Sequence, residues 1–249
     1  MLNAIYILWL RQLKRYFRSK SRMIGSLGQP ILFLVALGFG LGPIYERAGG
    51  GNYVQFIAPG IISMSIMFTA VFSGIEVIWD RQFGFLKETL VAPVPRYAIM
   101  LGRTFGGATV ATIQGVIVAL LAMVAGFRPQ SLILLPVALG FMFLIALLFT
   151  AMGTAIASRM QDMQAFPLIM NFLVMPLFFL SGALFPLQGA TKGIAIAATI
   201  NPLSYGVDAL RGALVNGTHY GFGTDLLVLT LGAAFFLGVG SWLFSKTEA

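Results

Sequence analysis

Six long apolar segments alternate with shorter polar stretches along the 249 residues of this chain. A helix needs about 20 apolar residues to cross the hydrocarbon core of a bilayer, and each segment provides about that many. The pattern therefore predicts an all-α membrane protein with six transmembrane helices in one domain, residues 1–249. The expected spans are 23–44, 53–79, 97–126, 131–157, 163–185 and 224–245.

Residues 1–22 show a different pattern, because apolar residues recur there at helical spacing with basic residues between them. Ile5, Trp9, Leu13, Tyr16 and Phe17 would share one face. This spacing favours an amphipathic helix in the membrane interface, with Trp9 and Tyr16 at headgroup depth, over a solvated basic tail. No small-residue cleavage site follows, so the segment is not read as a signal peptide.

The composition supports a membrane protein and excludes several other classes. The chain is 58% hydrophobic and 10% charged, whereas soluble domains are about 45–50% apolar and about 25% charged. It has no cysteine and one histidine, so we predict neither disulfides nor a metal site. The net charge of +8 is typical of basic cytoplasmic ends rather than of nucleic-acid binding.

The distribution of lysine and arginine predicts the orientation. With six spans, twelve of the sixteen basic residues fall on the side that carries both termini. The other side holds Arg47, Arg128, Lys192 and Arg211. The positive-inside rule therefore places both termini in the cytoplasm.

Residues 80–96 form a polar island between the second and third spans. Phe83, Leu86 and Leu90 would lie on one face of a short amphipathic helix that ends at Pro93 and Pro95. The residues alone leave two interpretations open, a connector on the membrane surface or a docking element for a cytoplasmic partner.

Residues 186–223 form a second island on the outer side. Two short helices are expected, at 193–200 and 203–215, and Asn201-Pro202 separates them. Asp208 and Arg211 are expected to pair at i, i+3. Partial re-entry into the outer leaflet is favoured over a surface hairpin.

Few ionisable or motif residues lie within the spans. Glu76 and Arg103 lie near the inner ends of spans two and three, and we expect both to snorkel to the interface. The Gly102-x-x-x-Gly106 motif predicts close helix packing. The chain contains no phosphate-binding loop, no acidic pair at mid-membrane and no filter-like sequence.

Four stretches make the sequence recognisable. They are residues 56–60 (FIAPG), 81–96 (RQFGFLKETLVAPVPR), 176–186 (PLFFLSGALFP) and 201–212 (NPLSYGVDALRG). In this order the chain resembles the membrane subunit of ABC-2 type transporters. The likeness is strongest to the branch with daunorubicin-type drug exporters and the nodulation lipo-oligosaccharide exporter.

The resemblance implies a subunit that is not an enzyme by itself. It would pair with a second copy or a sister permease, and with two P-loop ABC ATPase subunits that bind ATP and Mg. Membrane lipids are further partners, and the location is the cell membrane of a prokaryote.

The resemblance also implies roles for three segments. Residues 1–22 would be the connecting helix, 80–96 the coupling helix and 186–223 the re-entrant pair. The expected ATPase-coupling residues are Arg81, Phe83, Phe85, Leu86, Lys87 and Glu88. The expected outer gate consists of Asn201, Pro202, Tyr205, Asp208 and Arg211.

The cargo implied is an amphipathic drug, a lipid or a lipid-linked sugar that moves outward. Spans two and five would line its path, and spans one and five would lie near the dimer contact. Candidate path residues are Met64, Phe68, Phe72, Phe166, Asn171 and Met175. Two other functions fit the sequence, a secondary transporter or channel that works without ATP, and a membrane scaffold without cargo.

Overall fold

The computed structural model describes residues 2–47, 49, 51–85, 94–187, 189 and 191–245, and these are helices, turns and loops. The helices are α1 (Leu2–Arg18), α2 (Lys20–Gly40), α3 (Gly42–Arg47), α4 (Tyr53–Phe72), α5 (Ile75–Gln82), α7 (Arg96–Val124), α8 (Leu135–Ala157), α9 (Ala165–Phe179), α10 (Lys192–Ile200), α11 (Pro202–Val215) and α12 (Phe222–Ser245). The expectation of an all-α protein is confirmed over the described residues.

Five helical stretches are long and apolar enough to cross a membrane, with α4 and α5 counted as one stretch. They correspond to the expected spans one, two, three, four and six. The expected fifth span is α9, an apolar helix of only 15 residues. At 1.5 Å per residue it extends about 22 Å, less than the roughly 30 Å of a bilayer core. The chain is thus multi-pass, with one expected crossing shorter than the others.

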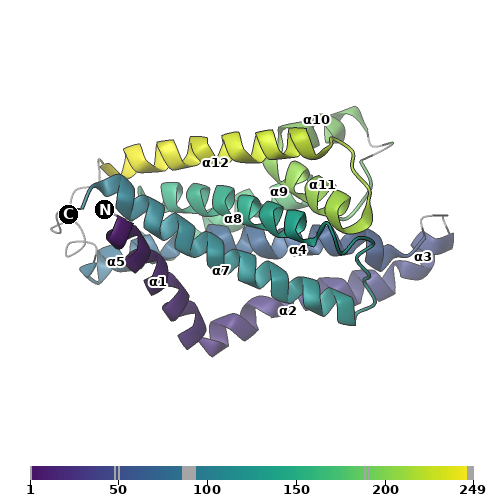
Figure 1. The fold of residues 1–249 in the computed structure, drawn as a ribbon, viewed down its shortest axis with the longest axis horizontal. Helices are drawn as coiled ribbons and strands as arrows, with labels where there is room; N and C mark the ends of the chain where they lie inside the picture. The colour runs from purple at the N-terminus through teal and green to yellow at the C-terminus, as the bar shows by residue number, and fades with distance from the viewer. Residues whose placement is uncertain are drawn as a thin grey trace.

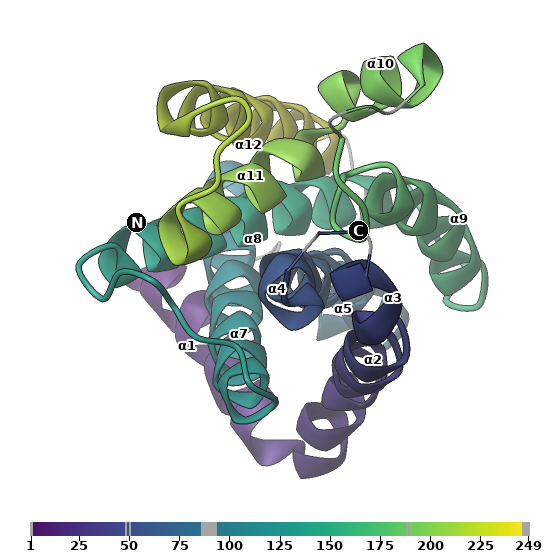
Figure 2. The same cartoon turned by 90° about the vertical axis from the view of Figure 1, so that its right-hand side faces the viewer.

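The bundle is built around α4, which α2, α7, α8 and α11 surround (Figure 2). Ile57, Ile61, Met64 and Met67 of α4 are fully or almost fully buried, as expected for a helix that is apolar on all sides. The start of α1, the end of α12 and helix α5 lie at one end, here called the terminal end (Figure 1). Helices α3, α10 and α11 lie toward the opposite end, here called the far end.

Helix α1 packs along α7 through the glycine motif. A β-carbon at Gly102 would lie 3.0 Å from the Ile5 carbonyl oxygen, and one at Gly106 would lie 3.3 Å from the Cα of Trp9. The predicted packing role of the motif is therefore confirmed. One face of α1, with Leu2, Tyr6 and Ile7, remains exposed.

Tyr16 is buried in the bundle, and its hydroxyl donates to Gln114 Oε1 at 2.7 Å. Its position at headgroup depth stays a prediction. Burial raises the pKa of the Tyr16 phenol, an effect that the nearby Arg22 opposes. The interfacial helix also ends earlier than residue 22. Helix α1 ends at Arg18, and α2 begins at Lys20.

The two polar islands differ in how much the structure describes. Helix α5 extends to Gln82, and Gly84 takes a φ of +81°, a conformation that glycine adopts without steric cost at a helix end. Leu86, Lys87 and Glu88 lie outside the described residues. The two short helices expected near 193–200 and 203–215 are present as α10 and α11, so that prediction is confirmed.

Candidate functional site

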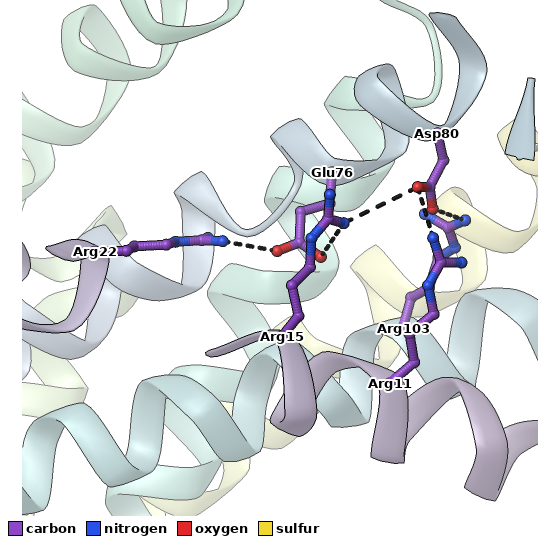
Figure 3. A network of polar contacts seen from close by, with 6 residues as sticks. All are labelled: Arg11, Arg15, Arg22, Glu76, Asp80 and Arg103. Atoms are coloured by element: carbon purple, nitrogen blue, oxygen red, sulfur yellow. Dashed lines mark hydrogen bonds and ion pairs between the residues drawn. The ribbon is translucent and has the colours of Figure 1, made fainter. Parts of the chain in front are cut away.

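A cluster of six charged side chains joins four helices at the terminal end (Figure 3). We call it the arginine–carboxylate cluster. It consists of Glu76 and Asp80 on α5, Arg11 and Arg15 on α1, Arg22 on α2, and Arg103 on α7. The two acids are spaced i, i+4, and so are Arg11 and Arg15, so each pair presents one helix face to the other.

Asp80 lies between two arginines. Its Oδ1 accepts from Arg11 Nη2 at 3.0 Å, and its Oδ2 accepts from Arg103 Nη2 at 2.6 Å. The side chains of Asp80 and Arg103 are only 5% and 3% exposed. A buried charge needs a partner of opposite sign, and Asp80 and Arg103 each provide that partner for the other.

Glu76 binds the remaining arginines. Arg22 Nη1 donates to Glu76 Oε1 at 2.9 Å, and Arg15 Nη1 lies 3.5 Å from Oε2. Arg15 also stacks over the Trp79 ring at 5.4 Å. The expectation that Glu76 and Arg103 snorkel outward is therefore wrong. Arginines from neighbouring helices come to the carboxylates, because the fold places α1 and α2 against α5.

The other side of α5 is tied to the loop that follows α8. Arg81 donates from Nη2 to the Ser158 carbonyl at 2.7 Å and from Nη1 to the Met160 carbonyl at 2.9 Å. Gln82 donates to the Gln161 carbonyl. Arg81 was predicted as a coupling residue, and here it holds that loop against α5. Of the other coupling candidates, Phe83 is exposed, and the ring of Phe85 lies under the guanidinium of Arg11.

The predicted gate residues come together at the far end, where they join α9, α10 and α11. Asn201 caps α11 by accepting from Leu203 N–H, and its amide donates to the Leu177 carbonyl at 2.6 Å. Pro202 occupies the first turn of α11. Tyr205 donates to the Thr199 carbonyl at 2.8 Å.

Asp208 and Arg211 do not form the expected ion pair among the described residues. Asp208 instead accepts from the backbone N–H groups of His219 and Tyr220, at 2.7 and 2.8 Å. Arg211 donates to the Gly182 carbonyl and lies 4.3 Å over the Phe56 ring. Burial lowers the pKa of the Arg211 guanidinium, and Asp208 opposes this shift. Each side chain thus stabilises a different loop, which sequence spacing does not reveal.

The predicted path residues are only partly brought together. Met64, Phe68 and Phe72 line a cavity of about 220 Å³ between α1, α2, α4 and α7. Phe166 of α9 meets Phe72 edge-on, with ring centroids 6.3 Å apart. Asn171 and Met175 lie farther along α9 and are not among the residues that line this cavity.

Sequence reasoning missed Arg11, Arg15, Arg22 and Asp80 as members of a site. The sequence feature that could have indicated this cluster is the i, i+4 spacing of Glu76 with Asp80 and of Arg11 with Arg15. It predicts two complementary faces but not that they meet. These groups join α5 to α1, α2 and α7 through ion pairs.

Comparisons with known proteins identify the family of this chain. Residues 3–215 match the model of the ABC-2 type transporter family. Nodulation protein J of Rhizobium leguminosarum bv. trifolii is 30% identical over 208 residues, 83% of this chain and 76% of that protein. Nodulation protein J of Sinorhizobium fredii is 28% identical over 224 residues, 88% of this chain and 84% of that protein. The predicted transport permease ycf38 of Cyanophora paradoxa is 28% identical over 213 residues, 84% of this chain and 73% of that protein. The chain therefore belongs to the ABC-2 type transporter family, as a non-catalytic transmembrane permease subunit.

Proposed function

We propose that this chain is the permease of an ATP-driven exporter that moves an amphipathic drug, lipid or lipid-linked sugar out of a prokaryotic cell. The family match over residues 3–215 carries this proposal, since ABC-2 permeases generally pair with ABC ATPase subunits. In this assembly two permease subunits, identical or sister chains, bind two ATPase subunits that hold ATP and Mg. Both termini face the cytoplasm, α9 is the fifth of six crossings, and α10 with α11 re-enters the outer leaflet.

The surroundings of α5 support a role in transmitting motion. The proposed coupling segment, residues 80–96, begins within α5. That helix is bound to α1, α2 and α7 through the arginine–carboxylate cluster and to residues 158–161 through Arg81 and Gln82. A push on residues 80–96 would therefore move several helices together rather than bend one loop.

Purification of the chain from native membranes in mild detergent tests the proposal. We expect a P-loop ATPase to accompany it, and ATP hydrolysis to respond to amphipathic compounds. A permease that purifies alone and transports without ATP would instead indicate a secondary transporter. A permease with a partner but no stimulated hydrolysis would indicate a scaffold.

A pair of lysine variants tests the coupling segment. Lys87→Glu should reduce ATPase binding, because it reverses a charge in the proposed contact. Lys192→Glu, the same change at the start of α10, should leave ATPase binding unchanged. Equal binding by both variants would contradict the assignment of residues 80–96.

A further inference from the structure

The corner between α1 and α2 encloses a cavity with charge at one side and an aromatic wall at the other. Figure 2 shows α1 and α2 meeting at a corner that stands away from α4 and α7. The cavity of about 220 Å³ lies between these four helices, and we call it the elbow cavity. Drug-sized sites measure about 300–1,000 Å³, so this space suits an alkyl chain or a single ring system rather than a bulky molecule.

The wall provided by α4 is apolar. Phe68 and Phe72 stack with centroids 6.2 Å apart and an interplanar angle of 8°, and Met64 continues the same surface. Pro30 of α2 and Val110 of α7 complete the apolar lining. The alkyl chain of a ligand would pack against these apolar groups.

The opposite side carries positive charge. Arg22 lines the cavity and uses Nη1 to bind Glu76, but a guanidinium has five N–H donors. The arginine–carboxylate cluster behind it has four arginines against two carboxylates. Arg18 and Lys20, both exposed at the corner, add further positive charge. An anionic group at Arg22 would compensate this excess.

One buried polar group beside the cavity, the Ser65 hydroxyl, lacks a partner among the described residues. Ser65 lines the cavity, is 3% exposed, and its buried hydroxyl oxygen makes no hydrogen bond. Buried hydroxyl groups are rarely left unpaired, so the Ser65 hydroxyl is available to a polar atom of a bound ligand. Gln29 and Thr69 add further polar groups to the lining.

We propose that the elbow cavity binds an anionic amphiphile, with its alkyl chain against Phe68 and Phe72 and its phosphate or carboxylate at Arg22. This binding requires neither ATP nor a partner subunit, so its test is independent of export. A two-chain membrane phospholipid and a single-chain compound share this chemistry. Competition between them distinguishes the two sources.

Gly25 offers a way to block the cavity without disturbing the packing. It lines the cavity, and a β-carbon there would have no neighbour within 4 Å. Gly25→Leu should therefore fill the space while the bundle remains intact. Gly40 lies on the same helix, also faces open space and does not line the cavity, so Gly40→Leu is the matched control.

The probe is palmitic acid with a photoactivatable diazirine in its chain, added to the full-length permease in phosphatidylcholine vesicles. Peptide mass spectrometry locates the adducts. We expect labelling of residues 64–72 in the native protein and in Gly40→Leu, and its loss in Gly25→Leu. Equal labelling of that segment in both variants would overturn the proposal, as would its absence from the native protein.

Two further arms test the charge and the source of the ligand. Arg22→Gln should weaken labelling by the acid about tenfold, the loss of one charge-assisted hydrogen bond, and leave the uncharged alcohol analogue unaffected. An equal effect on both probes would refute an anion site. If phosphatidylglycerol displaces the probe and unlabelled palmitate does not, the site binds membrane phospholipid. If palmitate displaces the probe and phosphatidylglycerol does not, the site binds single-chain compounds.

Discussion

At the residue scale, the contact on which folding stability depends most is the buried ion pair between Asp80 and Arg103. Both side chains are almost fully buried, and Asp80 is the carboxylate that lies within ion-pair distance of Arg103 in the described structure. Removal of one partner from a buried pair costs more than removal of both, because it leaves a charge without compensation. The three partly exposed arginines of the cluster contribute less, because solvent screens them.

This difference predicts the behaviour of two variants. Asp80→Ala should lower the stability of the folded permease by about 3–5 kcal/mol, since it strands Arg103. The double variant Asp80→Ala/Arg103→Met should recover much of that loss by removing the stranded charge. Thermal unfolding of the purified protein in detergent measures both. If the double variant is no more stable than Asp80→Ala, the unpaired Arg103 charge is not the cause of the lost stability.

At the element scale, small residues allow α4 and α5 to cross α8 closely. A β-carbon at Gly74, between α4 and α5, would lie 2.5 Å from the Gly153 carbonyl oxygen. A β-carbon at Gly153 would in turn collide with the backbone of Val71. Membrane helices often associate by close backbone approach at small residues. In lipid the hydrophobic effect does not drive helices together, so van der Waals packing has to hold them.

Gly153→Ala should therefore reduce the yield of folded protein, because the added methyl group meets backbone that cannot rotate away. Gly140→Ala, on the same helix, meets nothing within 4 Å and should be neutral or slightly stabilising. Size-exclusion chromatography of the two variants gives the comparison. Indistinguishable profiles would mean that the crossing can open to admit the methyl group.

At the scale of the whole molecule, the basic residues and the fold together define two ends. The structure places the start of α1, the end of α12 and helix α5 at one end, with α3, α10 and α11 toward the other (Figure 1). Most of the basic residues are expected at the terminal end, which the positive-inside rule assigns to the cytoplasm.

The chain has no cysteine, so single introduced cysteines report this orientation without background. A membrane-impermeant thiol reagent applied to intact cells should label Lys192→Cys and not Lys87→Cys. The reverse labelling would invert the orientation and place the proposed coupling segment outside the cell. Permeabilised cells, in which both positions should react, provide the control.

The sequence by itself determined the class of the protein, the positions of five long spans and the two short helices before and after Asn201. These depend on local properties, namely the length of apolar runs and helix-ending residues such as Asn201 and Pro202. It also predicted the packing role of Gly102 and Gly106, because small residues at i, i+4 mark a contact face whatever the partner.

The tertiary structure decided how distant charges and loops combine. Glu76 and Arg103 were expected to reach outward, and Asp208 and Arg211 to pair with each other. The fold instead brings Arg22 to Glu76, Asp80 to Arg103, and the 219–221 backbone to Asp208. Local spacing favours neighbours on one helix, but a buried charge binds whichever partner the packing places beside it. The partner depends on how the helices cross, which no single segment encodes.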